Sequence, residues 1–316
     1  MEERIRMGVS ACLLGQPVRY DSGHKRDRYI TDILGEYLEF VPVCPEVEAG
    51  FPIPRETFRL VGDPENPRLV TSRSNVDHTE RMLAWAEKRV AELEKEHLCG
   101  FIFKSDSPNS GLSRVKVYNA KGMADKKGVG LFARAFIQHF PLLPVEEEGR
   151  LNDAKLRETF IEQIFTLKRW RETMASSRSM KNLVEFHTRH KLLVLSHSPA
   201  HAKRMGKLVA EGKQMPIGEA TTHYEGLLIE ALRLKTTVKK NINVLEHILG
   251  YFKAQLSADE KQEVLEIFDR YRREFVPLIV PVTLLNHYVR KFDQPYLKQQ
   301  VYLNPHPVAL KLRNHA

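Results

Sequence analysis

Short apolar runs alternate with longer segments of helical periodicity along the first half of the chain. The apolar runs, which are typical of strands, cover residues 5–12, 39–44, 99–104 and 114–119. Apolar positions recur at helical spacing over residues 27–38, 76–97 and 128–140. Because strands joined through helices pair in parallel, this rhythm predicts an α/β three-layer sandwich with a mainly parallel sheet. Residues 58–62 and 67–72 are expected to add a small hairpin after the second strand.

Beyond residue 150 nearly every segment has helical periodicity. The predicted helices cover residues 156–174, 179–198, 199–212, 221–256 and 257–275. Ser257, followed three residues later by Glu260, predicts a capping box at the start of the last one. A chain of 316 residues exceeds what one core usually supports. Together with the acidic, glycine-containing segment 144–153, this predicts an α/β domain over residues 1–150 and an all-α domain over residues 151–316.

The net charge of +9 is unevenly distributed between these halves. Residues 1–150 hold 22 Lys+Arg against 23 Asp+Glu, a net charge of −1, whereas residues 151–316 hold 27 against 17, a net charge of +10. A one-sided basic excess suggests a polyanionic partner such as nucleic acid, although charge runs also serve simply as solvated surface. The sequence contains no apolar run long enough to cross a membrane and no apolar signal core, so we expect a cytoplasmic protein without a membrane partner.

Candidate chemistry gathers where the predicted strands end. Ligands of open parallel sheets bind beyond the carboxyl ends of the strands, which here brings together the loops at residues 10–27, 43–56 and 105–111. Two of these loops open with a cysteine, Cys12 and Cys44. Two cysteines at one sheet edge exceed what core packing requires, and they indicate metal or iron–sulfur ligation or a thiolate nucleophile. Cys99 begins its strand instead of ending it, so we expect a structural thiol there.

Charged side chains accompany the two cysteines in these loops. The acidic candidate is Glu46, and the cationic candidates for binding a substrate phosphate are Arg19, His24, Lys25 and Arg55. An alternative interpretation of the first-loop charges is surface charge together with a helix cap at Asp27.

The same three loops carry a family resemblance. "SACLLGQPVRYDSGHKRD", "VCPEVEAG" and "SPNSG" resemble the signature loops of the thiouracil desulfidase family. In the second half, "FHTRHKLLVLSHSPAH", "NVLEHILGYFK" and "VPLIVPVTLLNHYV" resemble the helical YbgA-like domain. The resemblance covers nearly the whole chain, and the fused arrangement is similar to bacterial enzymes that act on 4-thiouridine in tRNA. It implies a [4Fe-4S]-dependent, non-redox desulfuration of 4-thiouridine in tRNA or of thiolated uracil nucleotides, which releases hydrosulfide.

The resemblance also implies roles for individual residues. In this family three cysteines, one from each loop, hold a [4Fe-4S] cluster, and a carboxylate activates the attacking water. Cys12 and Cys44 match the first two ligands, Glu46 matches the carboxylate, and Ser107 matches a serine that we expect to orient water. The third ligand position departs from the family pattern, because Ser110 stands where the family has cysteine.

This departure leaves three arrangements open. In the first, a cluster is held by two thiolates together with Ser110 or another donor. In the second, Cys99 shifts to serve as the third ligand. In the third, the protein binds its nucleotide without iron. The corresponding alternative to the enzyme is a cluster-less RNA- or nucleotide-binding protein that retains the fold. A thiol-dependent enzyme that uses Cys12 or Cys44 as its nucleophile is a third hypothesis, but no histidine adjoins either cysteine in the sequence.

The basic second half is the expected site of tRNA contact, since phosphate contacts give affinity without reading sequence. The candidates are Arg189, Lys191, Lys203, Arg204, Lys207, Lys239, Lys240, Arg272 and Arg273. Histidines also recur there at helical spacing, at positions 187 and 190 and at positions 197 and 201. Pro199 is expected to interrupt the helix between the members of the second pair. A zinc site needs more ligands in a fixed geometry, so structural or RNA-facing histidines are favoured over a metal site.

Overall fold

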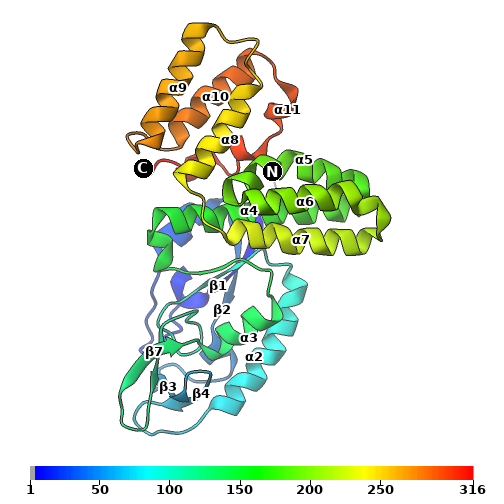
Figure 1. Cartoon of the computed structure of the whole chain (residues 1–316). Coiled ribbons are helices and arrows are strands. Elements are labelled where there is room, and N and C mark those ends of the chain that lie inside the picture. Colours follow the sequence, from blue (N-terminus) through cyan, green and yellow to red (C-terminus); the bar gives the residue numbers. More distant parts are fainter. Residues whose placement is uncertain (1–3, 316) are drawn as a thin grey trace. The chain divides into compact units, whose positions relative to one another are not determined.

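The protein is described by a computed structural model covering residues 4–315. The chain divides into two compact units, the first ending at Leu156 and the second beginning at Arg157 (Figure 1). The division lies six residues beyond the end of the predicted first domain. As predicted, the first unit combines a mainly parallel sheet with helices, and the described part of the second unit is all helical.

The main sheet of the first unit contains four parallel strands. They are β1 (Ile5–Ser10), β2 (Leu38–Val43), β5 (Phe101–Phe103) and β8 (Val145–Glu147), in the order β2-β1-β5-β8. The first three were predicted from their apolar runs. Strand β8 was not, because its three residues Val-Glu-Glu have an acidic composition that indicated a hinge. Its pairing with β5 instead makes this segment an edge strand of the sheet.

A second sheet of four strands was not predicted as a separate sheet. It contains β3 (Phe58–Asp63), β4 (Asn66–Thr71), β6 (Val115–Tyr118) and β7 (Ala124–Gly128), in the order β4-β3-β6-β7. The predicted hairpin is confirmed as the antiparallel pair β3–β4. The run at residues 114–119 does form a strand, but β6 pairs with β3 and β7 in this second sheet and not with the main one. Short apolar runs specify a strand, whereas the choice of sheet depends on distant partners.

Two longer helices and several short turns complete the first unit. The predicted helices are confirmed as α2 (Thr79–Leu93) and α3 (Leu131–His139). Phe136 of α3 packs against Phe101 and Phe103 of the main sheet, with ring centroids 4.9 and 5.4 Å apart. Residues 27–38, predicted as one helix, form only a π-helical turn and a 3-10 turn, at Tyr29–Ile33 and Leu34–Glu36. Asp27 does cap the first of these turns, since its Oδ1 accepts from the backbone N–H of Ile30 at 3.0 Å.

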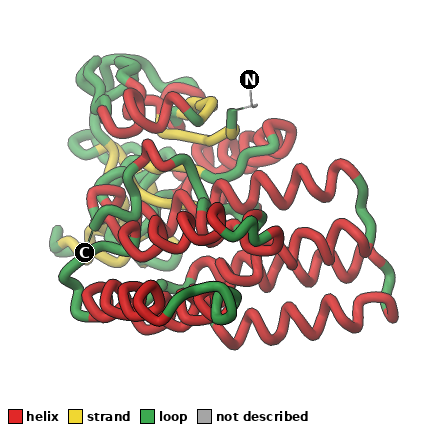
Figure 2. The backbone as a smooth tube through the Cα atoms, turned by 90° about the horizontal axis from the view of Figure 1, so that it is seen from above, coloured by secondary structure: helices red, strands yellow, loops and turns green. Residues whose placement is uncertain are grey.

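The second unit is a set of helices joined by short loops (Figure 2). Its helices are α4 (Ala154–Ser176), α5 (Met180–His197), α6 (Pro199–Glu211), α7 (Ile217–Arg233), α8 (Val238–Gly250), α9 (Ala258–Arg272), α10 (Ile279–Lys291) and α11 (Pro295–Lys298). The single helix predicted over residues 221–256 is two helices, because the Thr237 side chain caps the start of α8. The capping box of Ser257 and Glu260 is present. Within residues 4–315 no helix has both the length and the apolarity needed to cross a bilayer.

Buried polar side chains tie the second unit together. The Arg313 guanidinium, with only 5% of its surface exposed, pairs with Glu158 at 3.2 Å and with Glu162 at 2.8 Å. His197 lies 3.1 Å from the other oxygen of Glu162. As expected, the helix breaks before Pro199: α5 ends at His197, and Ser198 caps α6.

The remaining histidines of that stretch also have protein partners. His190 stacks on Phe186 with ring centroids 3.8 Å apart, and His187 lies 3.1 Å from the Tyr224 hydroxyl. His201 lies 2.8 Å from the Ser198 hydroxyl. These contacts fit structural roles for the four histidines.

Candidate functional site

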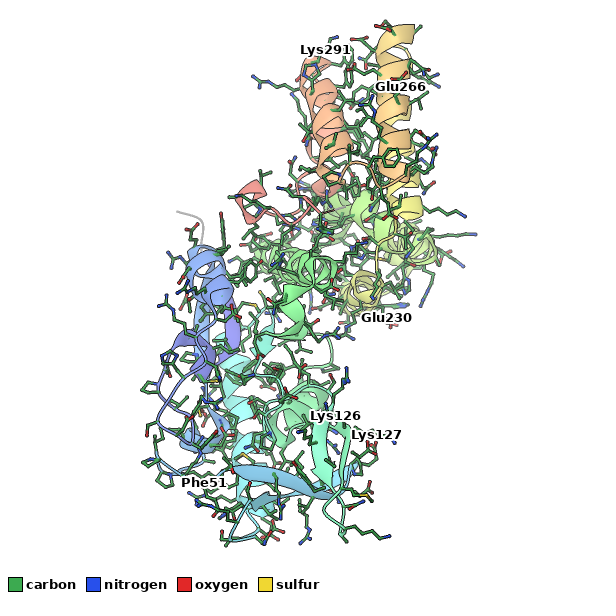
Figure 3. All side chains as sticks on the ribbon, turned by 90° about the vertical axis from the view of Figure 1, so that its left-hand side faces the viewer. Phe51, Lys126, Lys127, Glu230, Glu266 and Lys291 are labelled. Atoms are coloured by element: carbon green, nitrogen blue, oxygen red, sulfur yellow. The ribbon has the colours of Figure 1, made fainter. Side chains whose placement is uncertain are left out.

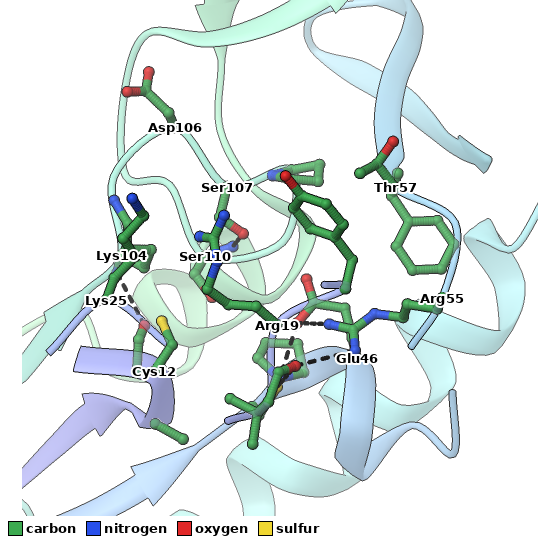
Figure 4. Close-up of a pocket in the computed structure, with 18 of the residues that line it drawn as sticks. Cys12, Arg19, Lys25, Glu46, Arg55, Thr57, Lys104, Asp106, Ser107 and Ser110 are labelled. Carbon is green, nitrogen blue, oxygen red and sulfur yellow. Dashed lines mark hydrogen bonds and ion pairs between the residues drawn. The ribbon is translucent and has the colours of Figure 1, made fainter. Parts of the chain in front are cut away.

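Three strand ends of the main sheet meet at one cavity. Strands β1 and β2 are parallel neighbours whose last residues, Ser10 and Val43, lie opposite each other, so the loops that carry Cys12 and Cys44 leave the sheet side by side. The loop after β5 reaches the same place (Figure 4). The cavity has a volume of about 390 Å³. Of the residues predicted for the site, those that line it are Cys12, Arg19, Lys25, Cys44, Glu46, Arg55, Ser107 and Ser110.

His24, which was predicted for the site, and Cys99, which was not, lie outside this lining. The exposed His24 has its Nδ1 atom within 3.2 Å of the Arg26 backbone N–H, so it shapes its own loop. Cys99 is buried just before β5, as expected for a structural thiol. Glu48 is directed elsewhere too: its carboxylate accepts from the Cys44 backbone N–H at 2.9 Å and pairs with Arg89 at 2.9 Å. Glu46 is therefore the carboxylate of the short helix α1 (Pro45–Glu48) that lines the cavity.

Of the two cysteines of the cavity, Cys12 is buried and Cys44 is partly buried. Cys12 lies in a 3-10 turn (Ala11–Leu14) directly after β1, and Cys44 precedes α1. Burial raises the pKa of Cys12 to about 11 and that of Cys44 to about 12, and the nearby Glu46 carboxylate contributes to both shifts. Without a metal both side chains are thus neutral thiols at pH 7. A bound cation would favour their thiolates, since metal ligation deprotonates cysteine.

The Glu46 carboxylate is held on three sides. Its Oε1 accepts a hydrogen bond from Asn109 Nδ2 at 2.8 Å. Its Oε2 lies 3.8 Å from the Arg55 guanidinium and 3.6 Å from the Cys44 sulfur. Arg55 is itself fixed by donating to the backbone carbonyl of Val18 at 3.0 Å. The side chain of Glu46 is 14% exposed, so a small molecule in the cavity can reach a carboxylate whose orientation is fixed.

The "SPNSG" loop is a rigid turn built around Ser107. The Ser107 Oγ accepts from the backbone N–H groups of Asn109 at 3.2 Å and Ser110 at 3.1 Å. Gly130 packs so closely that a Cβ there would lie 2.5 Å from the Asn109 backbone carbonyl. The turn directs Asn109 to Glu46, while Ser110, only 4% exposed, lines the cavity wall. Because its oxygen accepts both bonds, Ser107 keeps its hydroxyl hydrogen available for a ligand.

Sequence reasoning missed two contributors to the site. Asn109 was quoted within the motif but was given no role, although its amide fixes Glu46. Lys104 follows β5 directly and lines the cavity, and it bonds to Ser105 and Glu148. The rule that ligands bind beyond strand ends would have included Lys104. Asn109 carries no comparable signal, because a loop asparagine usually serves its own turn.

The cavity can be tested against the cluster that the resemblance implies. Thiolates are the usual ligands of iron–sulfur clusters. Cys12, Cys44 and Ser110 come from three different strand ends to one cavity, which suits a group bound from three sides. Among the described residues that line the cavity there is no third cysteine, and the third of these loops offers the Ser110 oxygen as a candidate donor. The residues fit a cluster held by two sulfur atoms and one oxygen.

Comparisons with known proteins bear on both halves of the chain. Residues 7–148 match the family model described as 2-thiouracil desulfurase, and residues 191–307 match a family described as a protein of unknown function, DUF1722. The Escherichia coli protein YbgA is 26% identical over 165 residues, which cover 52% of this chain and 98% of YbgA.

The chain joins a thiouracil-desulfidase-like domain to a YbgA-like domain.

Two further relatives resemble the thiouracil-desulfidase-like domain. The Bacillus subtilis protein YbbK is 29% identical over 150 residues, covering 46% of this chain and 97% of YbbK. A solved structure described as the [4Fe-4S]-dependent thiouracil desulfidase TudS is 28% identical, covers 48% of this chain and 95% of its own, and superposes with a TM-score of 0.39.

The structure shows which protein groups contact the basic residues of the YbgA-like domain that are predicted to bind RNA. Three of them form ion pairs with carboxylates: Lys207 with Glu211, Arg272 with Glu246 and Arg273 with Asp269. Lys240 instead donates hydrogen bonds to the backbone carbonyls of His197 and Lys235. Lys191 lies over the Tyr296 ring, 4.9 Å from its centroid. In the described part of the chain, the candidates without an ion pair to a carboxylate include Arg189, Lys203, Arg204 and Lys239.

Proposed function

We propose that the protein removes sulfur from a thiolated uracil nucleotide, with 4-thiouridine in tRNA as its substrate, to give uridine and hydrosulfide. One observation carries this proposal. Cys12, Cys44, Ser110 and the fixed carboxylate of Glu46 converge on one cavity in a domain that matches the 2-thiouracil desulfurase family.

The reaction exchanges sulfur for oxygen at one carbon atom. Water attacks the thiocarbonyl carbon, one of its protons is taken by the base and the other passes to the sulfur, the C–S bond breaks, and the sulfur departs as hydrosulfide, so no electrons are gained or lost. A cluster held by Cys12, Cys44 and Ser110 would supply a Lewis acid for the sulfur. Glu46 takes a proton from the attacking water, because its carboxylate faces the cavity and Asn109 and Arg55 hold it in one orientation.

Other side chains of the cavity bind and orient the substrate. The Ser107 hydroxyl donates its free hydrogen toward the attacking water. Lys25 lines the cavity and has no carboxylate partner among the described residues, so it is available for the substrate's own phosphate. Arg19 is the second cation for this phosphate, at an Nε–carboxylate distance of 3.5 Å from Asp21.

The test uses anaerobically reconstituted protein and tRNA that contains 4-thiouridine. We expect hydrosulfide release together with loss of the thiouridine absorbance. Glu46→Gln retains shape but removes the base, so turnover should fall by roughly 10² or more. Glu48→Gln is the matched control, because this carboxylate faces Arg89, and it should stay within a few-fold of the parent. Equal turnover in both variants would remove Glu46 from the reaction.

A second candidate function rests on Ser110. If an oxygen at the third position does not retain iron, the domain is a cluster-less nucleotide- or RNA-binding protein. Iron and labile sulfide, measured after anaerobic reconstitution, separate the two functions. About four iron atoms per chain, the number in a [4Fe-4S] cluster, support the enzyme. An iron-free protein that still binds the nucleotide supports the binding protein.

A further inference from the structure

The second sheet of the first unit presents two different faces. Leu60 of β3 and Val115 and Val117 of β6 are buried in a core with α2 and α3 residues. Side chains alternate between the faces of a sheet, so Arg59, Lys116 and Tyr118 lie on the opposite face. Strands β3 and β6 are parallel neighbours, with Leu60 opposite Val117 and Val61 opposite Tyr118. In this register Arg59 of β3 is a neighbour of Lys116 and Tyr118 of β6 on the same face.

A groove lined in part by side chains of this opposite face adjoins the candidate site. Its volume is about 510 Å³, and its lining includes Arg59, Lys116, Tyr118 and Lys126 from β3, β6 and β7. Three other residues, Phe58, Asp106 and Pro108, line both the groove and the cavity that contains Glu46. The cavity and the groove therefore lie next to each other and share these three lining residues.

The groove is cationic. Lys116 and Lys126 have no carboxylate partner among the described residues, and the only carboxylate of the described lining is Asp106. The Arg59 guanidinium lies 5.6 Å from the Tyr118 ring centroid and donates to Asn75 at 2.7 Å, while its buried Nε has no partner in the described structure. The neighbouring Lys127, which Figure 3 labels beside Lys126, differs because it pairs with Asp125 at 3.2 Å and does not line the groove.

We propose that this groove binds the sugar–phosphate backbone of an RNA strand that flanks the thiolated nucleotide. The inference rests on the proposed function, in which the thiolated base enters the adjoining cavity. A free nucleotide needs no such groove, because Lys25 and Arg19 in the cavity already serve its one phosphate group. Adjacent strands lie about 5 Å apart, so cations on three adjacent strands span about 10 Å, which suits successive phosphates of a chain.

Tyr118 supplies a further feature of a single-stranded RNA site. Its ring is partly exposed and lies between the cations, where a base next to the thiolated nucleotide can stack on it. Phosphate contacts and stacking together hold an RNA strand without reading its sequence. The RNA contact of the first unit is thus confined to the groove. The net charge of −1 over residues 1–150 does not reveal it, because acidic residues elsewhere offset the groove's cations.

The test compares two neighbouring lysines of β7 in the full chain. A labelled single-stranded RNA without thiouridine is titrated by fluorescence anisotropy over a series of salt concentrations. Lys126→Gln removes a groove cation, so affinity should fall several-fold at about 0.1 M salt, and the plot of log affinity against log salt should become less steep by about one. Lys127→Gln removes the same charge one residue away and should change neither quantity. Tyr118→Leu should lower affinity about 5-fold or more while leaving the salt slope unchanged.

Two results would overturn the proposal. Equal effects of Lys126→Gln and Lys127→Gln would show that only the overall charge matters. Unchanged affinity and slope in Lys126→Gln would place the RNA elsewhere. The RNA carries no sulfur and no turnover is measured, so this test is independent of desulfuration. Failure of the parent protein to release hydrosulfide from thiolated tRNA would instead overturn the proposed function, and a difference between the two lysine variants would still stand.

Discussion

Replacing Asn109 by aspartate changes the charge beside Glu46 without changing the shape of the side chain. Asn109 Nδ2 donates to Glu46 Oε1 at 2.8 Å, and the Asn109 side chain is fully buried. A carboxylate in its place puts two negative charges at that distance. At an effective dielectric constant of about 20, their repulsion is about 6 kcal/mol.

The folded variant avoids this repulsion by holding a proton between the two carboxylates. A carboxyl group of the unfolded chain has a pKa of about 4, so keeping one protonated costs about 1.4 kcal/mol for each pH unit above that value. The pKa of the introduced carboxyl is raised in the folded state, so the folded state loses stability as the pH rises above about 4. Asn109→Asp should therefore lower the free energy of unfolding by about 4–6 kcal/mol at pH 8 and by about 1–2 kcal/mol at pH 5.

Urea unfolding measured by tryptophan fluorescence tests this expectation. Trp85 lies in α2 of the first unit and Trp170 in α4, so a Trp170→Phe background isolates the signal of the first unit. Asn109→Ala is the control, since it removes the hydrogen bond to Glu46 without adding charge, and its effect should be about 1 kcal/mol at both pH values. If Asn109→Asp lowered the free energy of unfolding, relative to the parent, by the same amount at pH 5 and at pH 8, the side chains at positions 109 and 46 would not be in contact.

Three further predictions concern the cluster position and the YbgA-like domain. Ser110→Cys should raise the iron content after anaerobic reconstitution, because it supplies a third thiolate at the cavity, and unchanged iron content would mean that this position is not a ligand position. Burial lowers the pKa of His187 and of His306 to about 4, so the domain should lose about 1–2 kcal/mol per histidine as the pH falls from 7 to 5, measured by urea unfolding. Arg313→Met should destabilise the same domain by about 3–5 kcal/mol, because it leaves Glu162 and its neighbouring carboxylate without their cation, and an unchanged melting temperature would refute this.

The position of the site could be predicted from the sequence because it depends on sheet topology. Parallel strands bring their carboxyl ends to one edge, and this placed Cys12, Cys44 and Ser110 at one cavity. His24 was placed there too, since it lies in the same loop, but a loop of 18 residues does not direct every side chain inward. Its ring instead faces the Arg26 backbone.

The interactions that were not predicted depend on partners far apart in the sequence. The bond between Asn109 and Glu46 joins residues 63 positions apart, and a propensity for turns says nothing about such a partner. Strand β6 was recognised by its apolar alternation, yet its partner β3 lies more than 50 residues earlier, so the second sheet and its cationic face remained hidden. Strand β8 was missed because two of its three residues are glutamates, so the segment shows no apolar run and its acidic composition indicated a hinge.

The ion pairs of Arg313 have a consequence for synthesis of the protein on the ribosome. Arg313 contacts Glu158 and Glu162, which precede it by 155 and 151 residues and lie in the first helix of the second unit. Until residue 313 has left the ribosomal exit tunnel, these two carboxylates lack their cation, and the helical unit cannot complete its polar core. The first unit, which is compact in itself and ends at Leu156, can fold while the helices are still being translated. Proteolysis of ribosome-bound chains of increasing length should therefore show protection of the first unit well before protection of the second.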